Sequence, residues 1–209
     1  MRGLLAAPRM VSVAEFDKER HVPRLSVVIP CPGGATDFDG TLVAVLQNRP
    51  ADCEVLVVHG EPYDDPYALD SEVRFVRATC HDLASLANIG IEQATGEIVH
   101  LIGCGLTAQE GWTVPAVAQF KDPEVATVSP VVLAADRQHV HAAGVRWSLG
   151  GARQVVADDR VLLAGAGRLR SKILGPTLAA GFYRRDVLAA LGGFEAGLGD
   201  SLARTLARL

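Results

Sequence analysis

The sequence has few lysines, no basic excess and no long apolar run. Only three of its 20 basic residues are lysine, and 24 acidic residues give the 209-residue chain a net charge of −4. Domains that bind nucleic-acid backbones carry a basic excess, so nucleic acid is not an expected partner. No apolar run approaches the roughly 20 residues that cross a bilayer, and the apolar stretch 4–7 is shorter than the ~7 residues of a secretory signal. We therefore expect a cytoplasmic protein without a transmembrane segment.

The chain also lacks the C-x-x-C spacing of zinc ribbons and thioredoxin-type redox motifs. Its four cysteines are far apart in the sequence, at Cys31, Cys53, Cys80 and Cys104. In a reducing cytosol we expect all of them to be free thiols.

Composition and length predict one folded domain. Hydrophobic residues make up 49% of the chain and charged residues 21%, which is close to the globular average. Residues 1–24 show no steady hydrophobic period, so we interpret them as an N-terminal extension and residues 25–209 as the domain.

Within the domain, buried strand patterns alternate with helical ones. This alternation predicts an α/β fold with a mostly parallel sheet flanked by helices. Strands are expected over 25–30, 54–58, 73–77, 97–102, 125–132 and 178–183, with an irregular strand near 140–147. Helices are expected over 38–46 (capped by Thr36 or Asp37), 83–94 (closed by Gly96), 113–120 (capped by Thr113), 185–191 and after Asp200.

Ligands of open α/β sheets bind beyond the carboxyl ends of the strands. The residues at these ends are Pro30, Cys31, Pro32, His59, Glu61, Cys80, His81, Asp82, Gly103, Cys104 and Gly105. They are the first candidates for a functional site.

Several segments, in order, resemble family-2 glycosyltransferases with the nucleotide-sugar-binding GT-A fold. The resemblance covers about residues 25–209 and rests on the segments Ser26-Val-Val-Ile-Pro30, Glu54-Val-Leu-Val-Val58, Leu83-Ala-Ser-Leu-Ala-Asn88-Ile-Gly90-Ile, Ala94-Thr-Gly96-Glu97-Ile, Gly181-Phe-Tyr-Arg184-Arg185-Asp-Val-Leu and Leu191-Gly192-Gly193-Phe194-Glu195. His141-Ala-Ala-Gly144 is similar to a segment of rhamnosyltransferase-like members. The resemblance implies transfer of a sugar from a nucleotide-sugar donor to a glycan or lipid-linked acceptor.

The resemblance also implies roles for individual residues. It implies that the nucleotide-sugar donor is bound by Pro30, Cys31, Pro32, His59, Glu61, Asn88, Gly103, Cys104 and Gly105. Acceptor or phosphate contacts fall to His141, Arg184 and Arg185, and the catalytic base to Asp200.

The chain departs from the family's pattern at the residues that carry the chemistry. His59 stands where the family has an Asp that holds the nucleotide base. Ala87 stands where the family has a basic residue, and Gly199, before Asp200, stands where the family has a Glu. Gly103-Cys104-Gly105 replaces the Asp-x-Asp whose carboxylates hold a divalent metal. Mg²⁺ and Mn²⁺ prefer oxygen ligands and a thiol is a poor substitute. We therefore expect no metal cofactor, and Arg168, Arg170, Arg184 or Arg185 would have to supply the positive charge.

Alternatives remain open for most of these residues. Asp200 is either a catalytic base or a plain helix cap. His81 and Asp82 form either a proton relay or a helix cap. Arg184 and Arg185 are either a phosphate clamp or part of an ion-paired face. The turn at 103–105 either admits a ligand close to the backbone or is a relaxed loop. The set Cys31, His59, Cys80 and Cys104 could converge on a soft metal such as zinc, without local ligand spacing to support it. Trp112 and Trp147 are more typical of packing than of sugar platforms.

Two functions therefore follow from the sequence. One is a glycosyltransferase with an altered, metal-independent site. The other is a catalytically inactive relative that binds or scaffolds, as a homo-oligomer or paired with an active glycosyltransferase.

Overall fold

The computed structural model describes residues 24–32, 37–63, 65–149, 151, 153–156 and 173–195. The expected extension, apart from Arg24, and Arg168, Arg170 and Asp200 lie outside the described residues. The elements are β1 (Leu25–Cys31), α2 (Phe38–Asn48), β2 (Glu54–His59), β3 (Arg74–Arg77), α3 (Leu83–Gln93), β4 (Ile98–Ile102), α4 (Val114–Gln119), β5 (Thr127–Val128), β6 (Val132–Leu133), β7 (Val140–Ala142), β8 (Val145–Trp147), β9 (Arg153–Val155), β10 (Ala180–Arg184) and α5 (Arg185–Ala190).

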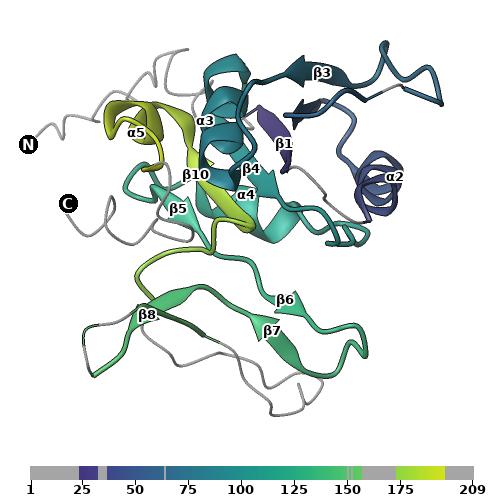
Figure 1. Ribbon diagram of the computed structural model, residues 1–209. Coiled ribbons are helices and arrows are strands. Elements are labelled where there is room, and N and C mark those ends of the chain that lie inside the picture. The colour runs from purple at the N-terminus through teal and green to yellow at the C-terminus, as the bar shows by residue number, and fades with distance from the viewer. Residues whose placement is uncertain are drawn as a thin grey trace, which may run out of the picture.

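A six-stranded sheet forms the centre of the molecule, in the order β3-β2-β1-β4-β10-β5 (Figure 1). Strands β1 to β4 are parallel to one another, whereas β10 runs antiparallel to β4 and β5. Two short hairpin-like pairs, β6 with β7 and β8 with β9, form a separate region beside the sheet. The carboxyl ends of β1, β2, β3 and β4 therefore lie along one edge.

Helices cover both faces of this sheet, because successive strand residues point to opposite sides. One face packs Val28, Leu56 and Leu101 against α3 and α5. The other packs Ile29 and Val57 against α2 and α4. Such strands, buried on both faces, are hydrophobic throughout, which explains the continuous apolar runs of the sequence.

The first four strands and first two helices confirm the sequence prediction to within a few residues. The expected strand over 125–132 is wrong as a single element. Residues 127–128 form β5 in the main sheet and the end of the expected strand forms β6 in a separate pair, with Ser129, Pro130 and Val131 between them. Pro130 has no N–H to donate to a ladder, so the strand is interrupted there.

The irregular strand expected near 140–147 is likewise two strands, β7 and β8, separated at Gly144. Gly144 has a φ of +120°, and a Cβ there would lie 2.7 Å from the Gly175 carbonyl oxygen. A residue with a side chain could not make this close approach, so the glycine sets the break.

The ends of the helices differ in part from expectation. Asp37 and Thr113 occupy the N-cap positions of α2 and α4, but neither side chain makes a capping hydrogen bond. Helix α3 ends at Gln93 with Ala94 as its C-cap, so Gly96 does not close it. No helix in the described part of the chain has the length and apolar character to cross a bilayer.

Candidate functional site

The carboxyl ends of β1, β2 and β4 bring six of the candidate residues to one edge of the sheet. Cys31 pairs in register with His59 of β2. On its other side, the Cys31 and Cys104 sulfurs lie 3.3 Å apart, and the Cys104 sulfur lies 3.7 Å from the Pro30 carbonyl oxygen. The remaining two, Gly103 and Gly105, flank Cys104. This grouping is what the sequence predicts from the carboxyl-end rule.

The turn after β4 is held by its backbone. The Gly103 N–H donates to the Ala179 carbonyl at 2.8 Å, and the Gly105 N–H donates to the Thr41 hydroxyl at 2.9 Å. Gly105 has a φ of +86°, a conformation that favours glycine, and nothing lies within 4 Å of where its Cβ would be. The turn thus exposes backbone to an open space and carries no side-chain oxygen.

The two thiols at this edge influence each other's ionisation. Cys104 can donate to Pro30 while it accepts from Cys31, which gives a chain of weak sulfur hydrogen bonds. The hydrogen bond to Cys104 and burial raise the pKa of Cys31, and the nearby Asp39 charge raises it further. The hydrogen bond from Cys31 lowers the pKa of Cys104. Cys104 is therefore the more nucleophilic thiol of the pair.

Beyond β2 lies an aromatic group that sequence reasoning missed. Tyr63 stacks on Phe75 with ring centroids 5.4 Å apart and meets Phe38 edge-on at 5.1 Å. The His59 ring lies 6.3 Å from that of Tyr63, and its Nδ1 donates to the Glu61 carbonyl at 2.6 Å. Burial and the neighbouring Asp39 raise the pKa of Tyr63 to about 12. The only sequence signal is an aromatic residue shortly after the second strand.

A cleft of about 910 Å³ adjoins the same edge beyond β4. It lies between the turn after β4, α4 and the segment that follows β5, and Gly105 is part of its wall. Its polar lining includes His100, Thr107, Gln109, Gln119 and Arg137. The cleft is large enough for a drug-sized ligand, and most of its lining is apolar, as is usual for ligand pockets.

Two aromatic residues at this cleft stand out. His100 is fully buried, stacks on Phe182 with centroids 3.8 Å apart, and donates from Nδ1 to the Gly181 carbonyl at 3.0 Å. Burial lowers the pKa of His100 to about 4 despite that hydrogen bond, so the ring is neutral at pH 7. The Trp112 Nε1–H is buried without a hydrogen-bond partner in the described part of the chain. A buried unpaired donor is rare and costly in folded proteins.

Asn88 lies away from this edge. Its amide brackets Phe194: Nδ2 donates to the Phe194 carbonyl at 2.7 Å, and Oδ1 accepts from the Phe194 N–H at 2.8 Å. The side chain thus joins the middle of α3 to the turn after α5, and both of its polar atoms are occupied by backbone.

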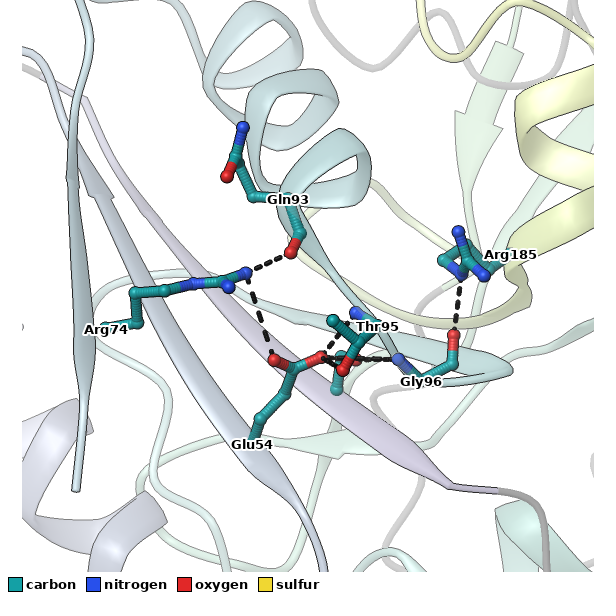
Figure 2. Close-up of polar contacts among 7 residues, drawn as sticks. Glu54, Arg74, Gln93, Thr95, Gly96 and Arg185 are labelled. Atoms are coloured by element: carbon teal, nitrogen blue, oxygen red, sulfur yellow. Dashed lines mark hydrogen bonds and ion pairs between the residues drawn. The ribbon is translucent and has the colours of Figure 1, made fainter. Parts of the chain in front are cut away.

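Arg184 and Arg185 lie at the opposite end of the sheet from residues 103–105. Because β10 is antiparallel to β4, Arg184 pairs with Ile98, where β4 begins. The Arg184 guanidinium donates to the carbonyls of Phe120, Asp122 and Val125. Arg185 donates from Nε to the Gly96 carbonyl at 2.8 Å (Figure 2). The structure therefore corrects the expectation of a phosphate clamp beside the donor: both groups hold backbone carbonyls at the amino end.

Figure 2 shows the polar cluster at this amino end, centred on Glu54. The Glu54 carboxylate accepts from the Ser26 hydroxyl at 2.5 Å, from both the N–H and hydroxyl of Thr95, and from the Gly96 N–H at 3.2 Å. Arg74 lies 3.8 Å away and also donates to the Gln93 carbonyl. Burial raises the pKa of Glu54, but these hydrogen bonds outweigh it and hold the pKa below its usual range. The cluster fastens the starts of β1, β2 and β4 together.

The remaining candidates are placed separately. Asp82 caps α3 by accepting from the Ser85 N–H at 2.9 Å, which agrees with the cap interpretation. A Cβ at Gly60 would lie 2.6 Å from His81 Nδ1, so His81 packs against the end of β2. His141 is exposed on β7, Trp147 is 42% exposed on β8, and Pro32 follows β1.

Residues 103–105 do not fit a hard divalent metal. They provide no carboxylate. The one side chain there is a thiol, which is already hydrogen-bonded to Cys31. In the described ranges, no three His, Cys, Asp or Glu side chains are arranged to hold a metal ion. The four-residue soft-metal set does not assemble there either, although two of its thiols meet.

Comparison with known proteins places the fold. No protein-family model and no curated protein matches the sequence. Among solved structures, GalNAc-T7 with UDP, GalNAc and Mn²⁺ is similar with a TM-score of 0.61 and 15% identity. The mannosyltransferase PcManGT from Pyrobaculum calidifontis, in complex with GDP-Man and Mn²⁺, is similar with a TM-score of 0.58 and 20% identity.

Both similarities cover 88% of this chain, but only 40% of the GalNAc-T7 chain and 51% of the mannosyltransferase chain. The chain thus spans about half or less of the length of these structures. At this level of identity the likeness establishes the architecture: the mostly parallel sheet flanked by helices is a GT-A fold, as the sequence predicts.

Proposed function

We propose that this chain is glycosyltransferase-like and binds a nucleotide-sugar donor along the carboxyl edge of β1, β2 and β4. The observation that carries the proposal is the GT-A sheet, whose strand ends gather Cys31, His59 and Cys104 beside an open cleft. Two similar structures contain UDP and GDP-Man, respectively, which supports a nucleotide-diphosphate ligand. Family-2 membership is part of the proposal, because it rests on the sequence motifs alone.

The donor's parts would be divided between two neighbouring surfaces. His59 and Tyr63, with Phe75 behind them, are suited to the planar base, since an aromatic group accepts stacking. The cleft beyond Gly105 is suited to a sugar, whose hydroxyls can pair with polar side chains of its lining such as Thr107 and Gln109. The acceptor, a glycan or lipid-linked sugar, would enter from the same side, where Arg137 and Gln109 line the cleft.

Binding would not depend on a divalent metal at residues 103–105. Both similar structures contain Mn²⁺, but the residues of this turn do not fit that ion, because their only functional side chain is a thiol. Arg184 and Arg185 are committed to backbone carbonyls at the far end. Among described residues, Arg137 is the arginine on the cleft wall and the best candidate to balance a leaving group's charge.

A second function is favoured by the same turn. The missing carboxylates suit a catalytically inactive protein that keeps donor or acceptor binding and acts as a scaffold, as a homo-oligomer or with an active glycosyltransferase. If turnover occurs, Asp200 is the proposed catalytic base, so a turnover assay with an Asp200 variant distinguishes the two functions.

Calorimetric titration with UDP-, GDP- and dTDP-sugars, with and without Mn²⁺, tests donor binding. We expect binding of one nucleotide class, with an affinity that Mn²⁺ does not change. Gln109→Ala removes a polar side chain from the cleft wall, so it should weaken binding about 5- to 10-fold, the equivalent of one hydrogen bond. Gln93→Ala, on an exposed side chain outside the cleft, is the matched control and should bind as the unmodified protein does.

No binding by any nucleotide sugar would contradict the proposal, and binding that requires Mn²⁺ would contradict its metal-independent part. If turnover is detected, Asp200→Asn should abolish it and leave donor affinity nearly unchanged. Binding without turnover on any acceptor would support the inactive alternative.

A further inference from the structure

Cys31 and Cys104 are neighbours because of the strand register. Strands β1 and β4 pair in parallel with a constant offset of 73 positions, from Leu25 opposite Ile98 to Val28 opposite Leu101. Cys31 and Cys104 are separated by the same 73 positions, so they lie opposite each other just where β4 ends. The apposition is thus a property of the sheet and does not depend on a flexible loop.

This placement meets the geometric needs of a disulfide. Neighbouring strands are about 4.8 Å apart, which falls in the range of roughly 4.4–6.8 Å between the Cα atoms of bridged cysteines. The two sulfurs are 3.3 Å apart, so closing to a bond of about 2.05 Å needs a movement of little more than 1 Å. The backbone that must yield is the turn at 103–105, where Gly105 has open space around its Cα.

Neither cysteine is fully buried. Cys31 and Cys104 are each partly exposed, and they lie at the edge beside the cleft. Cys104 is the nucleophile of the two, since Cys31 stabilises its thiolate by hydrogen bonding. Cys53 and Cys80 are also partly exposed, but within the described part of the chain neither sulfur meets that of another cysteine.

We propose that Cys31 and Cys104 form a reversible thiol–disulfide couple at the carboxyl edge of the sheet, with a low-molecular-weight disulfide such as oxidised glutathione as the oxidant. The Cys104 thiolate attacks one glutathione sulfur, forms a mixed disulfide and releases one glutathione thiolate. The Cys31 sulfur, as its proton leaves, then attacks the Cys104 sulfur and releases the second glutathione thiolate. Two protein thiols become one disulfide, and one oxidised glutathione becomes two reduced molecules that take up the two protons.

The couple would also control the proposed donor site, and this consequence rests on the proposed function. Closing the bond pulls the turn at 103–105 toward β1, between the surfaces proposed for the donor's base and for its sugar. Donor affinity should therefore differ between the reduced and the oxidised protein, whereas bond formation itself does not depend on any donor.

The test uses the full chain with Cys53→Ala and Cys80→Ala, so that only the pair remains. After incubation in glutathione redox buffers, free thiols are counted and the intact mass is measured. We expect both thiols to disappear together, a mass loss of two hydrogens, and full recovery with dithiothreitol. Cys31→Ser in this background should stop at a stable glutathione adduct, and Cys104→Ser should react more slowly with glutathione disulfide.

Two results would contradict the proposed disulfide between Cys31 and Cys104. One is that both thiols stay free under oxidising conditions, and the other is a doubly glutathionylated protein without an internal disulfide. The matched protein with Cys31→Ser and Cys104→Ser, which keeps Cys53 and Cys80, should form no internal disulfide; a bond there under the same conditions would contradict the claim that strand register selects the pair. Calorimetry of the reduced and oxidised forms then tests the consequence. An internal disulfide in a protein that binds no nucleotide sugar would leave the couple standing and contradict the proposed function alone.

Discussion

The side-chain amide of Asn88 pairs with both the N–H and the C=O of Phe194. The two hydrogen bonds, 2.8 Å and 2.7 Å long, connect α3 to a turn 106 residues further along the chain. Phe194 is buried against Tyr183, with ring centroids 5.5 Å apart. Gly193, at a φ of +75°, lets the turn approach, since a Cβ there would lie 2.5 Å from Asn88 Oδ1. Asn88 therefore anchors the end of the described chain onto the core.

Replacing Asn88 should destabilise the protein. Asn88→Ala leaves a backbone donor and an acceptor without their partners, at a cost of about 1–3 kcal/mol. Asn88→Asp keeps the acceptor but sets a carboxylate oxygen against the Phe194 carbonyl oxygen, so at pH 7 it should destabilise at least as much as Asn88→Ala. Urea unfolding at pH 7 measures both. If donor affinity falls in Asn88→Ala while stability is unchanged, Asn88 contacts the donor and the anchoring role is wrong.

Two helix glycines should respond to alanine in opposite directions. A Cβ at Gly90 would lie 2.3 Å from the Val28 Cγ1, where α3 packs on β1, so Gly90→Ala should cost about 1–3 kcal/mol by overpacking. At Gly40 in α2 nothing lies within 4 Å, so Gly40→Ala should stabilise by about 0.5–1 kcal/mol through helix propensity. Thermal unfolding of both variants checks the pair. Equal effects would contradict the close packing of α3 on β1.

His100 should make the protein lose stability as the pH falls from about 6.5 to about 4. Its pKa is lowered to about 4 in the folded protein, from an ordinary value of 6.5, so the unfolded chain binds more protons in this window. The contribution is complete above pH 6.5, and its loss amounts to about 3 kcal/mol by pH 4. His100→Gln removes the titration and should flatten the pH dependence of unfolding free energy.

Glu54 should affect the pH dependence of the unfolding free energy at lower pH than His100 does. Its pKa is lowered, so its stabilising contribution is present above the ordinary carboxyl range and is lost as the pH falls through the lowered value. Glu54→Gln should cost about 1–3 kcal/mol at pH 7, because a charged acceptor of several hydrogen bonds is lost. It should also remove part of the acid sensitivity at pH values below the ordinary carboxyl range, which urea unfolding across that range measures.

The matched control for Glu54 is Glu72→Gln. Glu72 forms a surface ion pair with Arg49 at 2.8 Å and its side chain is 52% exposed, so its loss should cost at most about 1 kcal/mol. Comparable losses in the two variants would contradict the structural role assigned to the Glu54 cluster.

Much of the site's location follows from local sequence. Continuous apolar runs identify strands buried on both faces, and their alternation with helical patterns implies parallel strands whose carboxyl ends meet. For this reason the sequence alone predicts that Cys31, His59 and Cys104 lie at one edge of the sheet. The pairing of Cys31 with Cys104 needs one further piece of information, the offset of 73 between β1 and β4.

The same rule could not have located Arg184 and Arg185, whose roles came from the resemblance, because it assumes a parallel strand. Strand β10 is antiparallel, so its carboxyl end lies at the amino end of its neighbours. Its hydrophobic pattern, which reports burial, is the same for either direction. The aromatic group around Tyr63 and the unpaired Trp112 N–H escape sequence reasoning for a related reason: each depends on contacts between segments far apart in the chain.

The sequence alone thus determined the first four strands, the first two helices and the α/β class of this protein, because burial and helix periodicity are written in neighbouring residues. The GT-A class followed from the resemblance of its segments to family-2 glycosyltransferases. The sequence also determined that no carboxylate stands at residues 103–105. Only the tertiary structure decided that two thiols meet at that turn, that Asn88 anchors Phe194 and that both arginines face the far end. These outcomes depend on strand direction and register, which arise from pairing between distant segments and leave no local pattern.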